Sequence, residues 1–336
     1  MIRIVSIGSV LSTEDPVSIA SVLSTEGSVL STEGLVLSTE GSVVSTEGSV
    51  LSTELSVVST DGPPRHVRRR GRRSLGAGRA RQRAGDAVIT THQLTKTFAT
   101  HGVGQHVLRD LDLSIYTGDF TVIMGASGSG KSTLLYSLSG MDRPTGGDVR
   151  FAGTSIVGRS ESELARFRRD NCGFVFQQVY LLSTMSLMDN VLAAGLLTSR
   201  DKKALEARGA ALFTQVHLAR SSWNKLPAQV SGGEAQRAAI IRALIGSPAV
   251  LFADEPTGAL DQTSGSAVLD VLTQVHTSGQ TVVMVTHDLR SARRANRILF
   301  LRDGAIVGDL TLWPYTSEHD PAREEALRSF LADMEW

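Results

Sequence analysis

The sequence is poor in features that mark secreted, membrane-spanning or nucleic-acid-coating proteins. Its single cysteine, Cys172, excludes an internal disulfide framework and is typical of a reducing compartment. Charge of one sign is not in excess either, because 34 basic residues balance 34 acidic ones. This balance argues against a chain built mainly to coat nucleic acid or an anionic membrane. The apolar share of 41% is enough to build the core of a globular enzyme.

Long apolar runs are missing as well. The longest candidate, Ala243 to Ala253, falls short of the roughly 18 to 20 residues that a membrane-spanning helix requires. Near the amino terminus, Glu14 and Asp15 interrupt a short apolar stretch before any small-residue cleavage site, which disfavours a secretory signal. We therefore expect a cytoplasmic protein that does not cross a membrane by itself.

Residues 1–62 contain a short repeat. From Ser24 to Asp61 the unit STEGSVL recurs every seven residues. Adjacent Val and Leu residues and a recurring Gly do not fit a coiled coil, so helix is disfavoured. The repeat is explained either as a poorly ordered low-complexity tract or as tandem-repeat DNA translated from a start codon placed too far upstream. We favour the second explanation.

Residues 63–85 form an arginine-rich segment. Between Pro64 and Arg83 there are nine arginines and no acidic residue. One interpretation is an arm that binds nucleic acid or lipid headgroups. We favour the other, a solvated linker or a part of the same mistranslated leader. A true start near Val88 would remove both the repeat and the arginine-rich segment.

From residue 86 onward the sequence changes to regular strand and helix patterns. The stretches VITTHQLTKTF and Val107 to Ile115 alternate like antiparallel strands. The short β-branched runs TVIMG, AVLFA and TVVMV, together with Cys172 to Phe176, are typical of strands buried on both faces of a parallel sheet. Helical patterns follow most of them, which predicts an α/β fold for residues 86–313. We also predict a helical subdomain at about 183–230, in which Lys203 to Leu218 has an amphipathic helical pattern, and a helical tail at 314–336.

A phosphate-binding loop is predicted directly after TVIMG. Gly125 to Ser132 fits the pattern G-x-x-x-x-G-K-S between a predicted strand and a predicted helix. The glycines let the backbone curl so that successive N–H groups point at phosphates, at the positive end of the following helix. Lys131 is predicted to neutralise the β- and γ-phosphates of a nucleotide, and the Ser132 hydroxyl to bind Mg²⁺.

Two consecutive carboxylates, Asp254 and Glu255, follow the apolar strand AVLFA. They are therefore expected at the carboxyl edge of the sheet, where such folds bind ligands. We predict that Asp254 holds Mg²⁺ through water and that Glu255 orients and deprotonates the attacking water. An Asp-Glu pair after a strand is usually only a loop start or a helix cap, so this prediction depends on the phosphate loop.

Two further segments resemble motifs of the ABC ATPases. VSGGEAQRAAIIRAL is similar to their signature motif, and DEPTGALD, from Asp254 to Asp261, is similar to their Walker B strand and D-loop. The resemblance implies a P-loop NTPase (RecA-like) core with an antiparallel β subdomain and an inserted α-helical subdomain. It also implies that Ser231, Gly232 and Gly233, at a capped and dipole-positive helix start, bind the γ-phosphate held by the opposite subunit.

The remaining family motifs follow in order. Gln177 in GFVFQQ matches the Q-loop glutamine, which in the family reaches Mg²⁺ and the attacking water. His287, after TVVMV, matches the switch histidine that contacts the γ-phosphate and supports the catalytic carboxylate. Phe98 matches the A-loop position, where an aromatic ring stacks on adenine, although the usual residue there is Tyr. The resemblance covers roughly Val88 to Leu310, and departures such as Glu234 for Gln remove no catalytic group.

These assignments give a complete predicted site. The catalytic residues are predicted to be Glu255, His287, Gln177 and Lys131, and the metal ligands to be Ser132, Gln177 and Asp254. The predicted ATP-binding residues are Phe98, Gly125, Ala126, Ser127, Gly128, Ser129, Gly130, Lys131, Ser132, Thr133, Ser231, Gly232, Gly233 and Asp261.

The resemblance also implies cofactors and partners. The cofactors are ATP and Mg²⁺, and two copies of the chain form a head-to-tail dimer that drives an integral-membrane permease from the cytoplasmic face of the cell membrane. GFVFQQ, DEPTGALD and RILFLRDGAIVGD are similar to ATPases that serve lipoprotein release and macrolide or peptide export. A soluble ABC ATPase acting on DNA or ribosomes is an alternative, as is a cell-division ATPase that does not transport. No nucleic-acid partner is expected.

Overall fold

The computed structural model describes residues 29–30, 35–37, 43–45, 50–51, 87–100, 103–317 and 319–336. The chain divides into two units, 1–73 and 74–336. In the first unit, four short strands pair antiparallel in sequence order: β1 (Val29–Leu30), β2 (Leu35–Leu37), β3 (Val43–Ser45) and β4 (Val50–Leu51). The rest of the repeat and the arginine-rich segment lie outside the described residues, so the predictions for both stay predictions.

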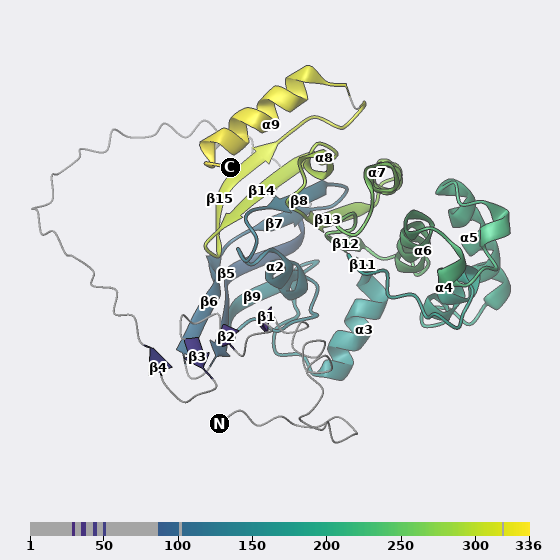
Figure 1. The fold of residues 1–336 in the computed structure, drawn as a ribbon. Helices are drawn as coiled ribbons and strands as arrows, with labels where there is room; N and C mark the ends of the chain where they lie inside the picture. The colour runs from purple at the N-terminus through teal and green to yellow at the C-terminus, as the bar shows by residue number, and fades with distance from the viewer. Residues whose placement is uncertain are drawn as a thin grey trace, which may run out of the picture. The chain divides into compact units, whose positions relative to one another are not determined.

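A six-stranded sheet organises the second unit (Figure 1). Its order is β11-β12-β13-β8-β14-β15, in which only the edge strand β15 runs antiparallel to its neighbour. Strands β8 and β13 are buried along their whole length, because helices or a second sheet cover both faces. The predicted α/β fold is confirmed. The strands are β8 (Phe120–Met124), β11 (Cys172–Val175), β12 (Val250–Asp254), β13 (Thr281–Val285), β14 (Arg297–Arg302) and β15 (Ala305–Thr311).

An antiparallel sheet flanks this core; three of its strands precede β8 in the chain and two follow it. Its strands pair in the order β10-β9-β5-β6, and β7 pairs with the start of β5. Alternating residues of these strands are buried against the parallel sheet, so this part forms the expected antiparallel layer. The strands are β5 (Ala87–Thr100), β6 (Val103–Leu111), β7 (Ser114–Tyr116), β9 (Gly146–Phe151) and β10 (Thr154–Ser155).

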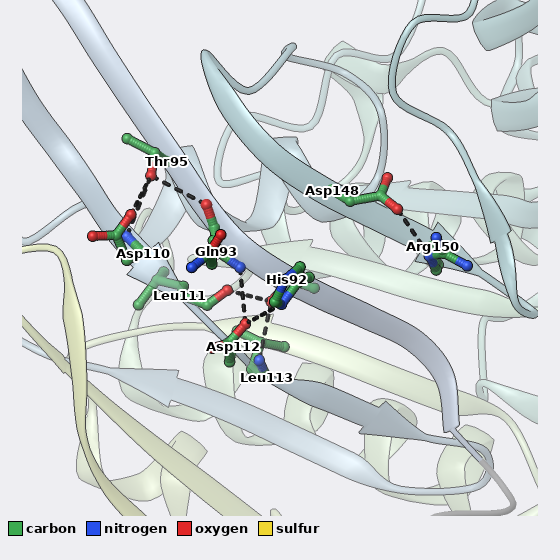
Figure 2. A network of polar contacts seen from close by, with 10 residues as sticks. His92, Gln93, Thr95, Asp110, Leu111, Asp112, Leu113, Asp148 and Arg150 are labelled. Carbon is green, nitrogen blue, oxygen red and sulfur yellow. Dashed lines mark hydrogen bonds and ion pairs between the residues drawn. The ribbon is translucent and has the colours of Figure 1, made fainter.

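Polar contacts fix an irregularity in the long strand β5 (Figure 2). The register between β5 and β9 shifts between His92 and Thr95. At that point Oδ1 of Asp112 accepts a hydrogen bond from the backbone N–H of Gln93 at 2.8 Å and lies 3.2 Å from Nδ1 of His92. These bonds fasten the irregular part of β5 to the connection between β6 and β7. The second half of β5 then pairs with β6 and carries Phe98.

Helices cover both faces of the parallel sheet. On one face, α2 (Lys131–Leu138) and α3 (Glu161–Asn171) share a buried apolar cluster with the antiparallel layer. On the other face, a second cluster joins α6 (Gly232–Leu244), α7 (Gln262–Thr277), the short α8 (Leu289–Ala292) and α9 (Pro321–Asp333). Alternation along β8 explains the division, because Val122 faces the α6 cluster and Ile123 faces the α2 cluster.

The segment between β11 and α6 is helical and lies at one end of the second unit (Figure 1). It contains α4 (Leu187–Gly195), α5 (Lys202–Gln215) and two 3₁₀ turns, Arg220–Ser222 and Pro227–Gln229. The helical pattern that we extended to Leu218 ends at Gln215, because His217 takes a left-handed φ of 54°. None of the helices among the described residues is long and apolar enough to span a membrane.

Candidate functional site

The loop from Gly125 to Gly130 connects β8 to α2 and curls back over the end of the sheet. A side chain at Gly125, where φ is 149°, would place its Cβ 2.1 Å from the backbone oxygen of Leu301 in β14. Gly130 caps α2 with a φ of 100° and without a side-chain hydrogen bond. The first turn of α2 contains no acidic residue. The start of this helix is therefore open to an anion, as the spacing of the glycines predicts.

The Lys131 side chain folds back along this loop. Its Nζ donates hydrogen bonds to the backbone oxygens of Gly125 and Ala126 at 2.9 and 2.8 Å. Burial lowers the pKa of the Lys131 ammonium, and the carboxylates of Glu255 and Asp254 oppose that shift. The structure thus brings the predicted lysine and both predicted carboxylates into one electrostatic environment.

Asp254 ends β12 directly beside the first turns of α2. Its Oδ1 accepts a hydrogen bond from the Ser132 hydroxyl at 2.9 Å, and its Oδ2 accepts one from the Tyr136 hydroxyl at 2.6 Å. Both carboxylate oxygens therefore have hydrogen-bond donors from the same helix. The contact between Ser132 and Asp254 joins two of the three predicted metal ligands.

Glu255 takes a separate position one residue later. Its backbone has a left-handed φ of 46°, and its N–H donates to the oxygen of Val285 at 3.0 Å. Oε1 lies 2.9 Å from Nδ1 of His287, and Oε2 accepts a hydrogen bond from the Thr286 hydroxyl at 3.3 Å. The predicted base and the predicted switch histidine are therefore in contact. This contact arises because β12 and β13 are parallel neighbours and end at the same edge.

Gln177 lies just beyond β11, on the neighbouring side of the same edge. A Cβ added to Gly258 would lie 3.0 Å from Nε2 of Gln177, so this side chain covers the turn that follows Glu255. The small size of Gly258 permits the approach. The side chain of Gln177 is exposed.

The predicted signature residues begin helix α6. Ser231 is the N-cap, and its hydroxyl accepts a hydrogen bond from the Glu234 N–H at 3.2 Å. Glu234 completes a capping box, because Oε2 accepts from the Ser231 N–H at 3.0 Å while Oε1 accepts from the Ser222 hydroxyl at 2.8 Å. These bonds, first the one from Ser231, hold the pKa of Glu234 below its usual range. Asp261 caps the next helix, α7, by accepting bonds from the N–H groups of Thr263 and Ser264 at 3.0 Å.

The phosphate loop and the signature motif do not meet within the chain. Helix α2, which begins at the loop, packs in the apolar cluster on one face of the sheet. Helix α6, which begins at Ser231, packs in the cluster on the opposite face. The structure therefore brings Lys131, Ser132, Asp254, Glu255, His287 and Gln177 to one edge and leaves the signature residues apart from the phosphate loop.

Phe98 projects from β5 with 42% of its surface exposed. Nζ of Lys96 lies 4.8 Å from the centroid of its ring and donates hydrogen bonds to Asp142 Oδ1 and the Arg143 oxygen at 2.6 and 2.7 Å. The ring is thus held beside a fixed cation and is available for stacking. A groove of about 980 Å³ runs along residues 126–129 of the phosphate loop, and Phe98 does not line it.

Sequence reasoning missed several residues that shape the site. Tyr136 contacts Asp254, and Thr286 contacts Glu255. Gln236 donates through Nε2 to the backbone oxygens of Phe176 and Pro256 at 2.8 and 2.9 Å, which ties α6 to both loops next to the carboxylates. Thr286 could have been found from its place beside His287. The other two sit inside helices, where only the tertiary structure reveals their partners.

Comparison with known proteins places the chain in a family. Residues 108–258 match the family model described as ABC transporter. The chain is 46% identical over 223 residues to the macrolide export ATP-binding/permease protein MacB of Rhodopseudomonas palustris (strain HaA2). This match covers 66% of this chain and 34% of that protein. It is 45% identical over 204 residues to the pyoverdine export ATP-binding/permease protein PvdT of Pseudomonas fluorescens (strain Pf0-1). That match covers 61% of this chain and 31% of the relative. The chain thus spans about a third of the length of these curated relatives.

One solved structure is similar to this chain over the whole length of the solved chain. The dimeric ATP-binding cassette MJ0796, in a post-hydrolysis state bound to ADP and Pi, is similar with a TM-score of 0.63 and 35% identity. The match covers 68% of this chain and 100% of that one. Because the fold, the order of the motifs and these relatives agree, the chain belongs to the ABC transporter family and contains one of its ATP-binding cassettes.

Proposed function

We propose that the chain hydrolyses ATP, with Glu255 as the base that activates the attacking water. The main support for this proposal is the contact between Glu255 and His287, which holds a carboxylate at the sheet edge next to the phosphate loop. Lys131 stabilises charge that develops on the transferred phosphoryl group, and Gln177 lies within reach of the same space. The similarity to a cassette solved with ADP and Pi supports this assignment.

The residues present fit a magnesium ion. The hydroxyl of Ser132, the carboxylate of Asp254 and the amide oxygen of Gln177 are the oxygen donors that Mg²⁺ prefers. Ser132 donates its proton to Asp254, which leaves the lone pairs of its oxygen for a cation. Bound there with ATP, Mg²⁺ would neutralise charge on the phosphates.

We further propose that two copies of the chain complete each other's sites. The separation of the two motifs on opposite faces of the sheet supports this arrangement, because the chain's own Ser231 belongs to a helix that packs away from its own phosphate loop. Phe98 and the loop residues 125–133 would serve one half of the composite site. Ser231, Gly232, Gly233 and Asp261 of the other copy would close it, because Asp261 caps α7, which packs with α6. The dimeric state of the similar cassette supports the same conclusion.

A mixing experiment tests the composite site. A chain with Lys131→Ala and a chain with Ser231→Arg should each be inactive as homodimers. A mixed dimer contains one intact composite site, formed by Lys131 of one copy and Ser231 of the other. We expect the mixture to hydrolyse ATP, whereas a site completed within one chain would leave the mixture as inactive as either variant.

The ATPase is proposed to energise export through a membrane permease, from the cytoplasmic face of the membrane. The names of the curated relatives combine ATP-binding and permease functions, and they give macrolides and pyoverdine as the exported molecules. Tyr180, Leu182 and Met185, with exposed fractions of 64%, 55% and 37%, offer an apolar surface between β11 and α4 for such a partner. Co-expression with its partner permease should move the chain into the membrane fraction, and an unchanged distribution would contradict the proposal.

A further inference from the structure

Tyr136 lies one helical turn after Ser132, on the same side of α2. Spacing of four residues places both side chains over the end of β12. There they bind different oxygens of one carboxylate: the Tyr136 hydroxyl donates to Oδ2 of Asp254 at 2.6 Å, and the Ser132 hydroxyl donates to Oδ1 at 2.9 Å. Two hydrogen bonds to opposite oxygens fix the rotation of the carboxylate, which one bond alone would leave free.

The surroundings of Tyr136 hold the residue in place. The side chain is partly buried against the apolar cluster between α2 and the two sheets. Its backbone oxygen accepts hydrogen bonds from the N–H groups of Met141 and Asp142 at 2.9 and 3.1 Å, which also anchors the residue.

We propose that Tyr136 is a positioning residue for cation binding: it holds Asp254 so that Asp254 in turn directs the Ser132 hydroxyl proton away from the nucleotide. The oxygen of Ser132 then presents its lone pairs to Mg²⁺ without first having to reorient. This inference rests on the proposed roles of Ser132 and Asp254. It adds a fourth residue to the three predicted metal ligands, one that does not touch the metal.

A purely structural role for Tyr136 predicts a different result. Its ring would contribute to packing, and removing the hydroxyl alone would change the stability of the fold and leave the affinity for the cation unaltered. The variant Tyr136→Phe separates these roles, because it keeps the ring and removes only the donor. Tyr116→Phe, on β7, is the matched control, because its ring lies 5.0 Å from the Arg297 guanidinium in another part of the fold.

The experiment measures metal binding apart from turnover. Titration of Mn²⁺ into the full chain saturated with ATP, followed by electron paramagnetic resonance, gives the affinity for the cation. Fluorescence of a methylanthraniloyl ATP in EDTA gives the affinity for nucleotide without metal. For Tyr136→Phe we expect Mn²⁺ affinity to fall roughly 10-fold, as for loss of a hydrogen bond to a charged group, with nucleotide affinity in EDTA unchanged. Tyr116→Phe should match the native chain in both measurements.

Asp254→Asn serves as the reference variant that separates two kinds of failure. Native Mn²⁺ affinity in Tyr136→Phe, together with a large loss in Asp254→Asn, would overturn the inference for Tyr136 and leave the role of Asp254 intact. Native affinity in both variants would overturn the proposed role of Asp254 itself. Equal loss of nucleotide affinity in EDTA and of Mn²⁺ affinity in Tyr136→Phe would indicate a general distortion of the phosphate loop and would also overturn the inference.

Discussion

Two helices of the cassette begin at residues assigned to the nucleotide, yet their first turns are built differently. Helix α2 begins at Gly130, which has no side chain to cap the free N–H groups. Helix α6 begins at Ser231, whose hydroxyl and capping partner Glu234 satisfy the helix within the chain. The first start is incomplete until an anion arrives, whereas the second is already stable without one.

This difference between the two helix starts predicts separate roles in binding the nucleotide and in closing the dimer over it. An open helix start flanked by Lys131 favours phosphate groups in a single copy of the chain. The capped start of α6 gains less stability from a bound nucleotide, because the Ser231 hydroxyl already has a hydrogen-bond partner within the helix. We therefore expect α2 to determine nucleotide affinity and α6 to determine whether two copies close over the nucleotide.

The largest expected effect concerns the base, which belongs to the α2 side of the site. Glu255→Gln keeps the shape of the side chain and the contact with His287 but removes the proton acceptor. Turnover should fall about 1,000-fold while ATP binding is retained, so an ATP-bound dimer should accumulate. Steady-state phosphate release and size-exclusion chromatography with ATP measure both effects. A normal turnover rate would refute Glu255 as the base.

Lys131→Ala should weaken nucleotide binding about 100-fold, because the loop loses its charge-assisted bonds to phosphate. Equilibrium binding of a fluorescent ATP to the monomer is the measurement. Lys202→Ala, which removes an exposed lysine that pairs with Glu206 on α5, is the control. Native-like affinity in Lys131→Ala would mean that α2 does not determine binding.

Ser231→Arg tests the α6 side and should leave ATP binding by the monomer within about twofold of the native value, because the residue lies away from its own loop. Turnover and ATP-dependent dimerisation should be lost, since the arginine fills the surface that meets the other copy. Ser160→Arg is a matched control, because Ser160 caps α3 with the same type of capping box. If both variants lost turnover equally, loss of a helix cap would explain the effect.

The same pair of serines permits a test of stability. Ser231→Ala and Ser160→Ala should each lower the free energy of unfolding by about 1 kcal/mol, as expected for a lost N-cap. Only Ser231→Ala should also reduce turnover. Urea denaturation and phosphate release distinguish the two contributions, and an equal change of turnover in both variants would contradict the comparison.

The smallest effect concerns the acid sensitivity of the α6 cap. The pKa of Glu234 is lowered in the folded chain from its usual value of 4.5, chiefly by the bond from the Ser231 N–H. Its contribution to stability is therefore complete above that value and is lost as the pH falls through the folded pKa. Glu234→Gln should flatten the dependence of the unfolding midpoint on pH below about 4.5. An unchanged pH dependence would show that the capping box does not contribute.

Much of the fold follows from local sequence. The β-branched runs of β8, β12 and β13 predict buried parallel strands, and the glycine spacing predicts a loop that receives phosphates. β15 was not predicted as a strand, because an edge strand of half-exposed and exposed residues lacks a strong alternation signal. β14 was not predicted either, although it is buried from Arg297 to Leu301, because its apolar run of four residues is short and bounded by arginines. The end of α5 was placed too late because the left-handed turn at His217 is not encoded by a glycine.

The sequence by itself determined which chemical groups this protein contains and in which order, because the motifs depend on residue type and short spacing. Only the tertiary structure decided which of them meet. Parallel pairing of β12 and β13 brings Glu255 to His287, and the packing of α2 brings Tyr136 to Asp254. The same packing sets Ser231 on the far face of the sheet from the phosphate loop. Such contacts join residues far apart in the chain, and local patterns carry no information about them.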